Sequence, residues 1–261
     1  MKRFILINCI FLMFISISHN TFSYDIKDDE KTLSIVTPIW DDWTNKDETG
    51  FYFELINLIY KPLGYKTDIS FTPFARAFRL IELKKADLMF SLYSRDENSE
   101  VLTSQHPIDA GTVLIIFDNK LSWNGMSSLH KQNVIMPRAY KYHQYITEDF
   151  IPMEIKDSEQ GMAMFLHGRA PYFVTHYVEM LKLQKEHNID PTKYRTEVLM
   201  QRNLHVGYAK TEKGAKLREI FDKKMSEIIQ NGVIEKLYKK WNIKQLVNFQ
   251  IDTPNSRTVV L

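Results

Sequence analysis

Two parts of the sequence carry side chains suited to holding a charged or planar group. The run Trp40-Asp41-Asp42-Trp43 places two aromatic rings around two carboxylates, an arrangement that can bind a cation or stack on a planar group. A solvated loop with half-buried tryptophans accounts for the same residues equally well. Arg138 follows an expected strand at 134–137 and precedes an expected helix, whose free amide groups favour an anion. These residues are candidates for binding a charged or planar group.

Sequence motifs for catalysis are missing. The nine glycines form no phosphate loop, dinucleotide fingerprint or nucleophile elbow. Among the eight histidines no pair has metal-ligand spacing with a carboxylate, so the chain has no HExxH motif. We therefore expect no cofactor and no metal, and we consider binding before catalysis.

The single cysteine, Cys9, lies in an N-terminal segment, residues 1–23, that has the features of a secretory signal peptide. Two basic residues precede an apolar run of about 14 residues, and Thr21 and Ser23 supply the small residues of a cleavage site. A transmembrane anchor needs about 20 apolar residues, so this run is too short to span a membrane. We expect the leader to be removed and the protein to reach the periplasm.

The exported chain, residues 24–261, has a composition that excludes several functional classes. Without the leader it has no cysteine, which excludes disulfides, thiolate metal sites and a cysteine nucleophile. The leader also carries two of the 34 basic residues and no acidic residue, so 32 basic residues remain against 32 acidic ones. A neutral total does not favour nucleic acid, which usually binds a basic surface. We expect a small-molecule ligand and no nucleic-acid partner.

Short β-type runs alternate with amphipathic helical patterns, which predicts an α/β fold with largely parallel sheets. Strands are expected at residues 33–37, 66–71, 87–92, 111–117, 133–136, 171–175 and 204–208. Helices are expected at about residues 50–61, 72–81, 157–166, 176–187, 217–230 and 234–241. Tyr93 follows the third strand at its carboxyl end, where open α/β sheets place ligands.

Eight short motifs, each weak alone, occur in order between about residues 32 and 242. They are Gly50-Phe51 with Glu54-Leu55 and Leu63-Gly64, Pro73-Phe74-Ala75-Arg76-Ala77, Lys85-Ala86-Asp87, Ser91-Leu92-Tyr93, His106-Pro107, Leu166 to Ala170, Asn231-Gly232 and Lys240-Trp241. Together they resemble the extracellular solute-binding proteins of family 3, the periplasmic receptors of amino-acid-type ABC transporters.

The resemblance implies a two-lobed, type II periplasmic-binding-protein-like fold. Two crossing hinge segments would join the α/β lobes, with the ligand cleft between them. The first lobe would comprise residues 24–110 and 206–261, and the second lobe residues 111–205. Ligand binding closes such lobes by hinge bending, and an ABC permease in the inner membrane recognises the closed form. We expect the protein to be a monomer.

The sequence departs from this family at the two positions that clamp an α-amino acid. Asn98 stands where the family has the arginine that pairs with the ligand carboxylate, and Arg95 stands where it has a threonine. Pro171 and His176 stand at the two aspartate positions that serve the ligand ammonium. Arg95 could restore the carboxylate contact from a rearranged loop. We favour the alternative, a ligand that is not an ordinary α-amino acid.

The resemblance also places aromatic and charged side chains in the cleft. The loop with Trp40 and Asp42 would enter it, and Tyr52 and Phe74 occupy positions where the family has cleft aromatics. Phe74 fits the core-facing stripe of its helix at least as well. Arg76 lies one turn into the same helix, with a surface ion pair as the alternative.

His176 and Arg95 complete the set of candidate ligand-binding residues. His176 could donate or accept a hydrogen bond and change charge near neutral pH, although a satisfied surface histidine explains it equally well. The function implied is a periplasmic solute-binding protein that captures a small polar solute, amino-acid-like or a derivative, for an ABC importer without catalysis. The alternatives are an orphan ligand-sensing protein and a cyclohexadienyl-dehydratase-like enzyme, for which the sequence offers no identifiable acid–base pair.

Overall fold

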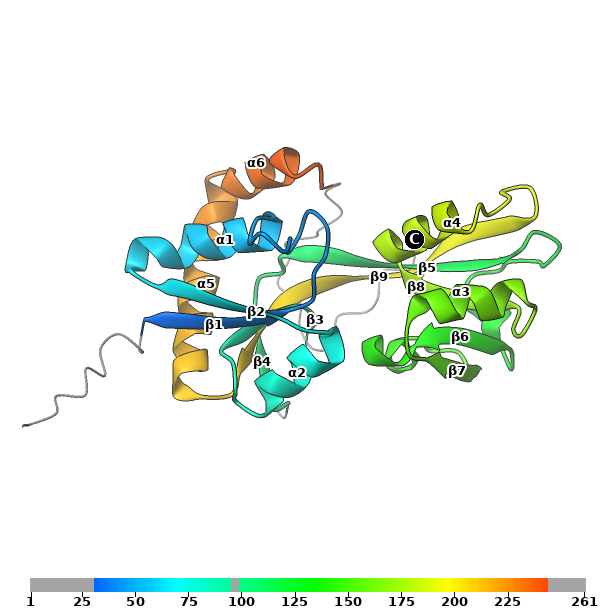
Figure 1. Ribbon diagram of the computed structural model, residues 1–261, viewed down its shortest axis with the longest axis horizontal. Coiled ribbons are helices and arrows are strands. Elements are labelled where there is room, and N and C mark those ends of the chain that lie inside the picture. The colour runs from blue at the N-terminus through cyan, green and yellow to red at the C-terminus, as the bar shows by residue number, and fades with distance from the viewer. Residues whose placement is uncertain (1–30, 95–98, 244–261) are drawn as a thin grey trace, which may run out of the picture.

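One continuous ladder of hydrogen-bonded strands runs through both halves of the molecule (Figure 1). The computed structural model describes residues 31–94 and 99–243, so the predicted leader at 1–23 lies outside the described residues. The strand order is β2-β1-β3-β9-β5-β8-β6-β7, with β4 paired to β9.

The strands are β1 (Thr32–Thr37), β2 (Lys66–Phe71), β3 (Leu88–Tyr93), β4 (Val101–Thr103), β5 (Asp109–Asp118), β6 (Asn133–Pro137), β7 (Ile151–Ile155), β8 (Tyr172–His176) and β9 (Tyr194–Ala209). The α-helices are α1 (Phe51–Tyr60), α2 (Phe74–Glu82), α3 (Ser158–Leu166), α4 (Tyr177–Glu186), α5 (Glu212–Gln230) and α6 (Val233–Lys240). Short 3-10 helices are η1 (Lys61–Leu63), η2 (Ser127–Leu129), η3 (Arg138–Tyr140) and η4 (Tyr142–Gln144).

Figure 1 shows these elements grouped into two lobes that β5 and β9 connect. The first lobe contains β1 to β4 with α1, α2, α5 and α6, and the second contains β6 to β8 with α3 and α4. The prediction of largely parallel sheets is wrong. Pairs among β1, β2 and β3 and among β6, β7 and β8 are parallel, but β9 runs antiparallel to β3, β4 and β5, and β5 runs antiparallel to β8. The chain crosses between the lobes in opposite directions, so the two crossing strands must be antiparallel.

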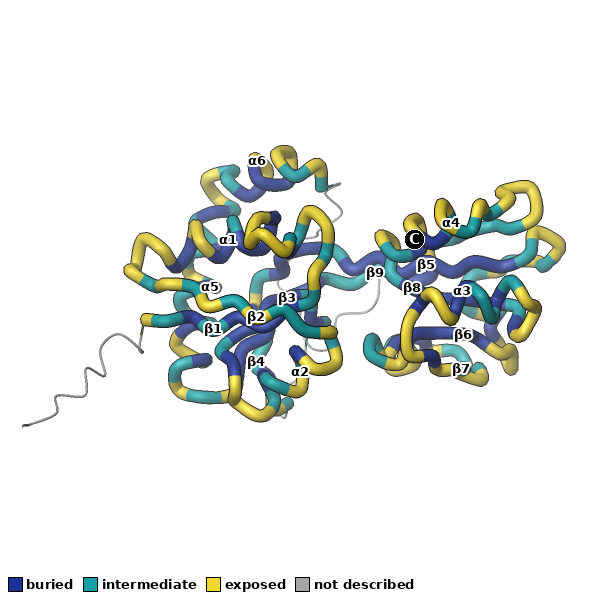
Figure 2. The backbone as a smooth tube through the Cα atoms, in the orientation of Figure 1, coloured by how far each residue is buried: buried dark blue, intermediate teal, exposed yellow. Residues whose placement is uncertain are grey.

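Each lobe has a hydrophobic core on both faces of its sheet, because successive strand residues point to opposite sides. In β5, Val113 and Ile115 pack into one core of the second lobe, whereas Leu114 and Ile116 pack into the other. In the first lobe the larger core lies under α1, α5 and α6, and a smaller one lies under α2. Figure 2 shows the central strands, such as β3, β5 and β8, mostly buried, and the helices exposed on their outer faces.

The crossing strands β5 and β9 are the longest in the described chain and pair along their whole shared length, from Asp109 opposite Leu204 to Asp118 opposite Tyr194. The lobe boundaries predicted at 110/111 and 205/206 fall within these two strands and stay a prediction. The prediction of a strand at 204–208 missed the first half of β9. That half is only partly buried, and its polar residues Arg195, Thr196 and Glu197 are consecutive, so it has no alternating pattern.

Local signals in the sequence determine several element ends. The Asp157 carboxylate accepts the Gln160 N–H at 2.9 Å and so caps α3. Pro73 is the N-cap residue of α2, and no side chain caps this helix, so α2 begins later than the expected residue 72. In the described ranges no helix has the length and apolar character needed to cross a membrane.

Candidate ligand-binding cleft

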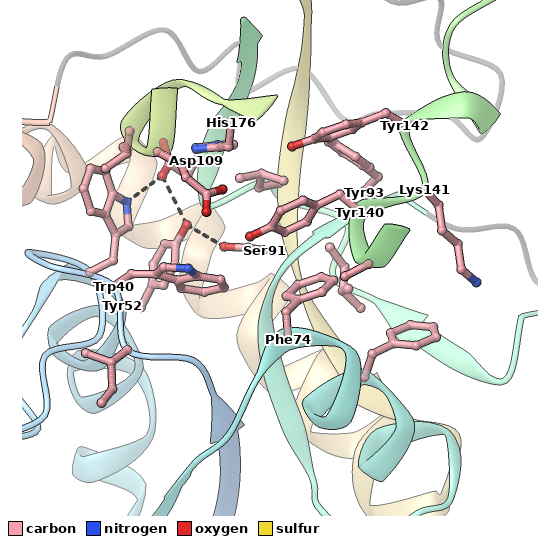
Figure 3. Close-up of a pocket in the computed structure, with 18 of the residues that line it drawn as sticks. Trp40, Tyr52, Phe74, Ser91, Tyr93, Asp109, Tyr140, Lys141, Tyr142 and His176 are labelled. Carbon is pink, nitrogen blue, oxygen red and sulfur yellow. Dashed lines mark hydrogen bonds between the residues drawn. The ribbon is translucent and has the colours of Figure 1, made fainter. Parts of the chain in front are cut away.

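A cavity of about 410 Å³ lies between the two lobes, beside the crossing strands. The first lobe contributes the loop between β1 and α1, the start of α2, the end of β3 and the first residue of β5. The second lobe contributes residues 139–145 and the start of α4. Figure 3 shows side chains from both lobes around this one space. A volume of this size is typical of pockets for small molecules.

The loop between β1 and α1 is held in a tight conformation that presents two tryptophans to the cavity. Thr44 N–H donates to the Trp40 carbonyl at 2.8 Å, and Tyr52 N–H donates to the Trp43 carbonyl at 3.1 Å. Gly50 permits this arrangement with a φ of 127°. A Cβ atom there would lie 2.4 Å from the Trp43 carbonyl oxygen, so only glycine fits.

Aromatic rings form the wall of the cleft and meet across it. Phe74 of α2 lies 6.3 Å from Trp40 and 5.4 Å from Tyr140 of the second lobe, measured between ring centroids. Tyr93 at the end of β3 lies 4.7 Å from Tyr145 of the second lobe in an edge-to-face contact. Such contacts can hold the two lobes together while a planar or cationic group is enclosed.

Asp109, the first residue of β5, is a buried carboxylate in the wall of the cleft, with 8% of its surface exposed. Its Oδ2 atom accepts the Trp43 indole N–H at 2.7 Å and the Tyr52 hydroxyl at 3.1 Å. Its Oδ1 atom accepts the Ala110 N–H at 2.7 Å. Ser91 then donates to the Tyr52 oxygen at 2.9 Å, as the chain of contacts in Figure 3 shows. All these partners are neutral groups.

Burial raises the pKa of Asp109 from its usual 3.8 to about 6, because desolvation disfavours the charged carboxylate. The hydrogen bonds from Ala110, Trp43 and Tyr52 lower the pKa, but they offset only part of this effect. Asp109 is therefore mainly ionised at neutral pH and becomes neutral in mildly acidic solution.

Tyr52→Phe should destabilise the protein more at pH 8 than at pH 4.5. The lost hydroxyl donates to an ionised Asp109 at pH 8, where a charge-assisted bond contributes about 2 kcal/mol, compared with about 1 kcal/mol for a neutral bond. Urea unfolding at the two pH values measures the difference. Tyr60→Phe is a matched control, since its buried hydroxyl contacts the Leu217 carbonyl and the Tyr208 hydroxyl. An equal loss at both pH values for Tyr52→Phe would contradict the role given to this bond.

His176 precedes α4 as its N-cap residue and faces the cleft. Burial lowers its pKa to about 4, because the imidazolium form loses solvation there. The prediction that it changes charge near neutral pH is therefore wrong, and His176 is a neutral hydrogen-bonding group. Glu179, one turn later, accepts the Thr175 hydroxyl at 2.9 Å and also lines the cleft.

Five residues predicted for the site line the cavity: Trp40, Tyr52, Phe74, Tyr93 and His176. They come from separate elements of both lobes, and strand ends and loops bring them together (Figure 3). Arg95 lies outside the described residues, as does Asn98.

Three other predicted residues do not line the cavity. Asp42 is exposed, with a φ of 70° that turns it away while its neighbour Asp41 lines the cleft. Arg76 lies on the exposed face of α2. Arg138 is 75% exposed. Its Nε atom donates at 3.0 Å to Glu154 of the neighbouring strand β7, so Arg138 forms its ion pair outside the cleft.

Sequence reasoning missed the carboxylate of Asp109 and the tyrosines that follow Arg138. Asp109 comes two residues after Pro107 of the His106-Pro107 motif, but its sequence position gives no sign that two distant side chains will contact it. Residues 139–145 contain three tyrosines, and this density of aromatics was a usable signal for a binding surface. No group of three or more metal-binding side chains occurs in the part of the chain that the structure describes.

A sequence profile of the bacterial extracellular solute-binding proteins, family 3, matches residues 38–244. The chain belongs to this family. The match covers both lobes and the loop that carries the tryptophans, which confirms the resemblance drawn from the eight motifs. No curated protein sequence matches the chain.

Solved structures share the fold at low sequence identity. A mutant of ArgBP from T. maritima is 14% identical with a TM-score of 0.64, and the match covers 84% of this chain and 99% of that one. The substrate binding protein of an amino acid ABC transporter is 16% identical with a TM-score of 0.62, covering 82% and 100%. A histidine kinase sensor domain with similarity to periplasmic binding proteins is 14% identical with a TM-score of 0.65, covering 81% and 96%. The predicted two-lobed α/β fold is confirmed.

The family motif at Ser91-Leu92-Tyr93 has a structural reason. Ser91 has a φ of 64°, in the left-handed region that favours glycine. The pairing of β3 with β9 is irregular between Met89 and Leu92, so the strand bends at this point. The bend directs Ser91 and Tyr93 into the cleft.

Proposed function

We propose that this solute-binding protein captures a small polar solute, amino-acid-like or a derivative, and delivers it to an ABC importer. The observation that carries the proposal is the cavity of about 410 Å³, which both lobes line beside the crossing strands β5 and β9. A solute that contacts both lobes stabilises their closed arrangement, which a permease can then distinguish from the open one.

The ligand differs from an ordinary α-amino acid in this proposal. Among the described residues no arginine lines the cavity, so a bidentate partner for an α-carboxylate is not provided there. The family's aspartate position holds a neutral His176. The aromatic wall and the carboxylates instead suit a solute with a planar or cationic part.

The test is a thermal-shift and calorimetric screen of the purified protein against amino acids, polyamines, organic acids and sugars. A ligand should raise the melting temperature by mass action and bind with one-to-one stoichiometry. Small-angle X-ray scattering should then show a smaller radius of gyration with the ligand. If no compound shifts the melting temperature, the proposal fails.

Phe74→Ala should weaken ligand binding about 10- to 100-fold, because Phe74 packs on Trp40 and reaches Tyr140 across the cleft. Leu58→Ala is the control, since Leu58 is 42% exposed and lies away from the cavity. Titration calorimetry on both variants measures the change. Equal affinities for Phe74→Ala and the wild-type protein would show that the aromatic wall does not contribute to ligand binding.

We propose further that residues 1–23 direct export and are removed, which places the protein in the periplasm. Mass spectrometry of the secreted protein should give Tyr24 as the first residue. Sensing and catalysis are the alternatives to transport. Chromatography of a bound compound after incubation separates a binder from a dehydratase-like enzyme, and uptake of the labelled solute by cells that lack the gene separates transport from sensing.

A further inference from the structure

Asp109 has an incomplete set of partners for a buried carboxylate. A carboxylate offers about four lone-pair positions, and the Trp43, Tyr52 and Ala110 donors occupy three of them. No lysine or arginine in the described ranges forms an ion pair with Asp109. A buried ionised carboxylate without a cation is costly unless a partner arrives. The small exposed part of Asp109 belongs to the wall of the cavity.

The described side chains of the cleft do not supply the missing cation. Lys141 lies over the Phe78 ring at 5.7 Å from its centroid, and Figure 3 shows its ammonium end turned away from Asp109. Lys182 also lines the cavity, but it is 69% exposed and lies 3.8 Å from Glu186. Neither lysine forms an ion pair with Asp109.

The carboxylates that line the cleft outnumber the lysines. Asp41 and Glu179 line the cleft together with Asp109, against Lys141 and Lys182. His176 contributes no positive charge at neutral pH. Aromatic rings enclose the same space, and their faces attract cations. An anionic solute would meet carboxylates and ring faces, both of which repel it.

We infer that the solute carries an organic cation, an ammonium or guanidinium group, and that Asp109 is the residue that selects it. The inference rests on the proposed function and names the chemical class of its ligand. Asp109 lies at the start of a crossing strand, so a cation paired with it contacts the hinge side of the cleft. The neutral donors Trp43 and Tyr52 hold the carboxylate in place for this contact.

The test compares cationic probes with neutral molecules of the same shape by titration calorimetry at pH 7.5. The pairs are choline with 3,3-dimethyl-1-butanol and butylguanidinium with butylurea, and succinate and the common amino acids complete the set. The cationic member of at least one pair should bind about 30-fold more tightly than its neutral partner or better. Asp109→Asn should weaken that binding about 100-fold.

Asp68→Asn is the matched control, because Asp68 is exposed on the edge strand β2 and the change removes the same charge. It should change the affinity by less than about twofold. Binding of neutral or anionic probes that Asp109→Asn leaves unchanged overturns the inference and leaves the proposed function standing. The absence of binding by every probe overturns both.

A second measurement needs no variant and remains available if Asp109→Asn does not fold. Affinity of the wild-type protein for the cationic probe should fall about tenfold per pH unit as the pH drops below about 6, because protonation removes the charge of Asp109. Tyr52 and Tyr238 face Asp109 from α1 and α6 and stay neutral in this range, since burial raises the pKa of both. His176 also keeps its neutral form above pH 5. An affinity that is constant from pH 8 to pH 5 contradicts the inference.

Discussion

Asp109→Asn should remove a pH dependence of about 3 kcal/mol from the stability of the protein. The pKa of Asp109 is raised from 3.8 to about 6 in the folded state, so the folded protein binds more protons than the unfolded chain between these two values. The stabilisation that the raised pKa of Asp109 contributes to the wild-type protein is complete below pH 3.8, and it is lost as the pH rises through about 6. A shift of about 2 units corresponds to roughly 3 kcal/mol.

Urea unfolding of the two proteins at pH 4.5 and pH 7.5 should show about 2 kcal/mol of this effect, because pH 4.5 lies above the unfolded pKa. At pH 4.5 the free energy of unfolding of Asp109→Asn should be lower than that of the wild-type protein. At pH 7.5 the difference between the two proteins should be much smaller. Taking the difference between proteins cancels the titration of all other groups. Asp68→Asn should show no such change, because Asp68 is exposed. Parallel pH profiles for Asp109→Asn and wild type would show that the carboxylate is not desolvated.

Gly50→Ala should destabilise the protein by about 2 to 6 kcal/mol. An alanine cannot adopt the φ of 127° without strain of about 1 to 3 kcal/mol. Its Cβ atom would also lie 2.4 Å from the Trp43 carbonyl oxygen, and relief of such a clash moves backbone at a further cost of about 1 to 3 kcal/mol. Because the clash displaces the loop of Trp40 and Trp43, affinity for the solute should also fall.

Gly125→Ala separates strain from the clash. Gly125 has a φ of 69°, and a Cβ atom there meets nothing within 4 Å, so the change should cost about 1 to 2 kcal/mol. Urea unfolding measures the stability of both variants, and calorimetry with the solute measures the loop effect. Equal losses of stability in Gly50→Ala and Gly125→Ala would mean that the loop between β1 and α1 accommodates the added Cβ atom without an energetic penalty from the clash.

The secondary structure could be predicted where one periodic pattern decided it. In β5, alternate apolar residues face two cores, and α5 repeats its buried side chains Leu217, Phe221 and Met225 at helical spacing. The first half of β9 was missed because its polar residues lie partly exposed at the edge of the second lobe's sheet, where this half pairs with β5. Periodicity reports burial on one face, and this half has no uniformly buried face.

The candidate site could be predicted only where position along a single element was enough. Tyr93 ends a buried strand, and Trp40 lies in the loop after β1, so both could be expected at the cleft. Arg138 follows a strand in the same way, yet it pairs with Glu154 on β7 outside the cleft. The position of a residue at a strand end predicts which edge of the sheet it lies on. It does not predict the ion-pair partner of a long charged side chain, because that partner belongs to another strand.

The sequence by itself determined the family and a chain without cysteine after the expected leader. It also determined the loop, helix and strand end that carry Trp40, Tyr52 and Tyr93. Only the tertiary structure decided the chemistry of the cleft. Trp43 and Tyr52 reach Asp109 from 66 and 57 residues away, and burial then shifts its pKa to about 6. Burial likewise keeps His176 neutral. The charge of a group depends on the solvent and donors around it, and folding brings these from distant parts of the chain.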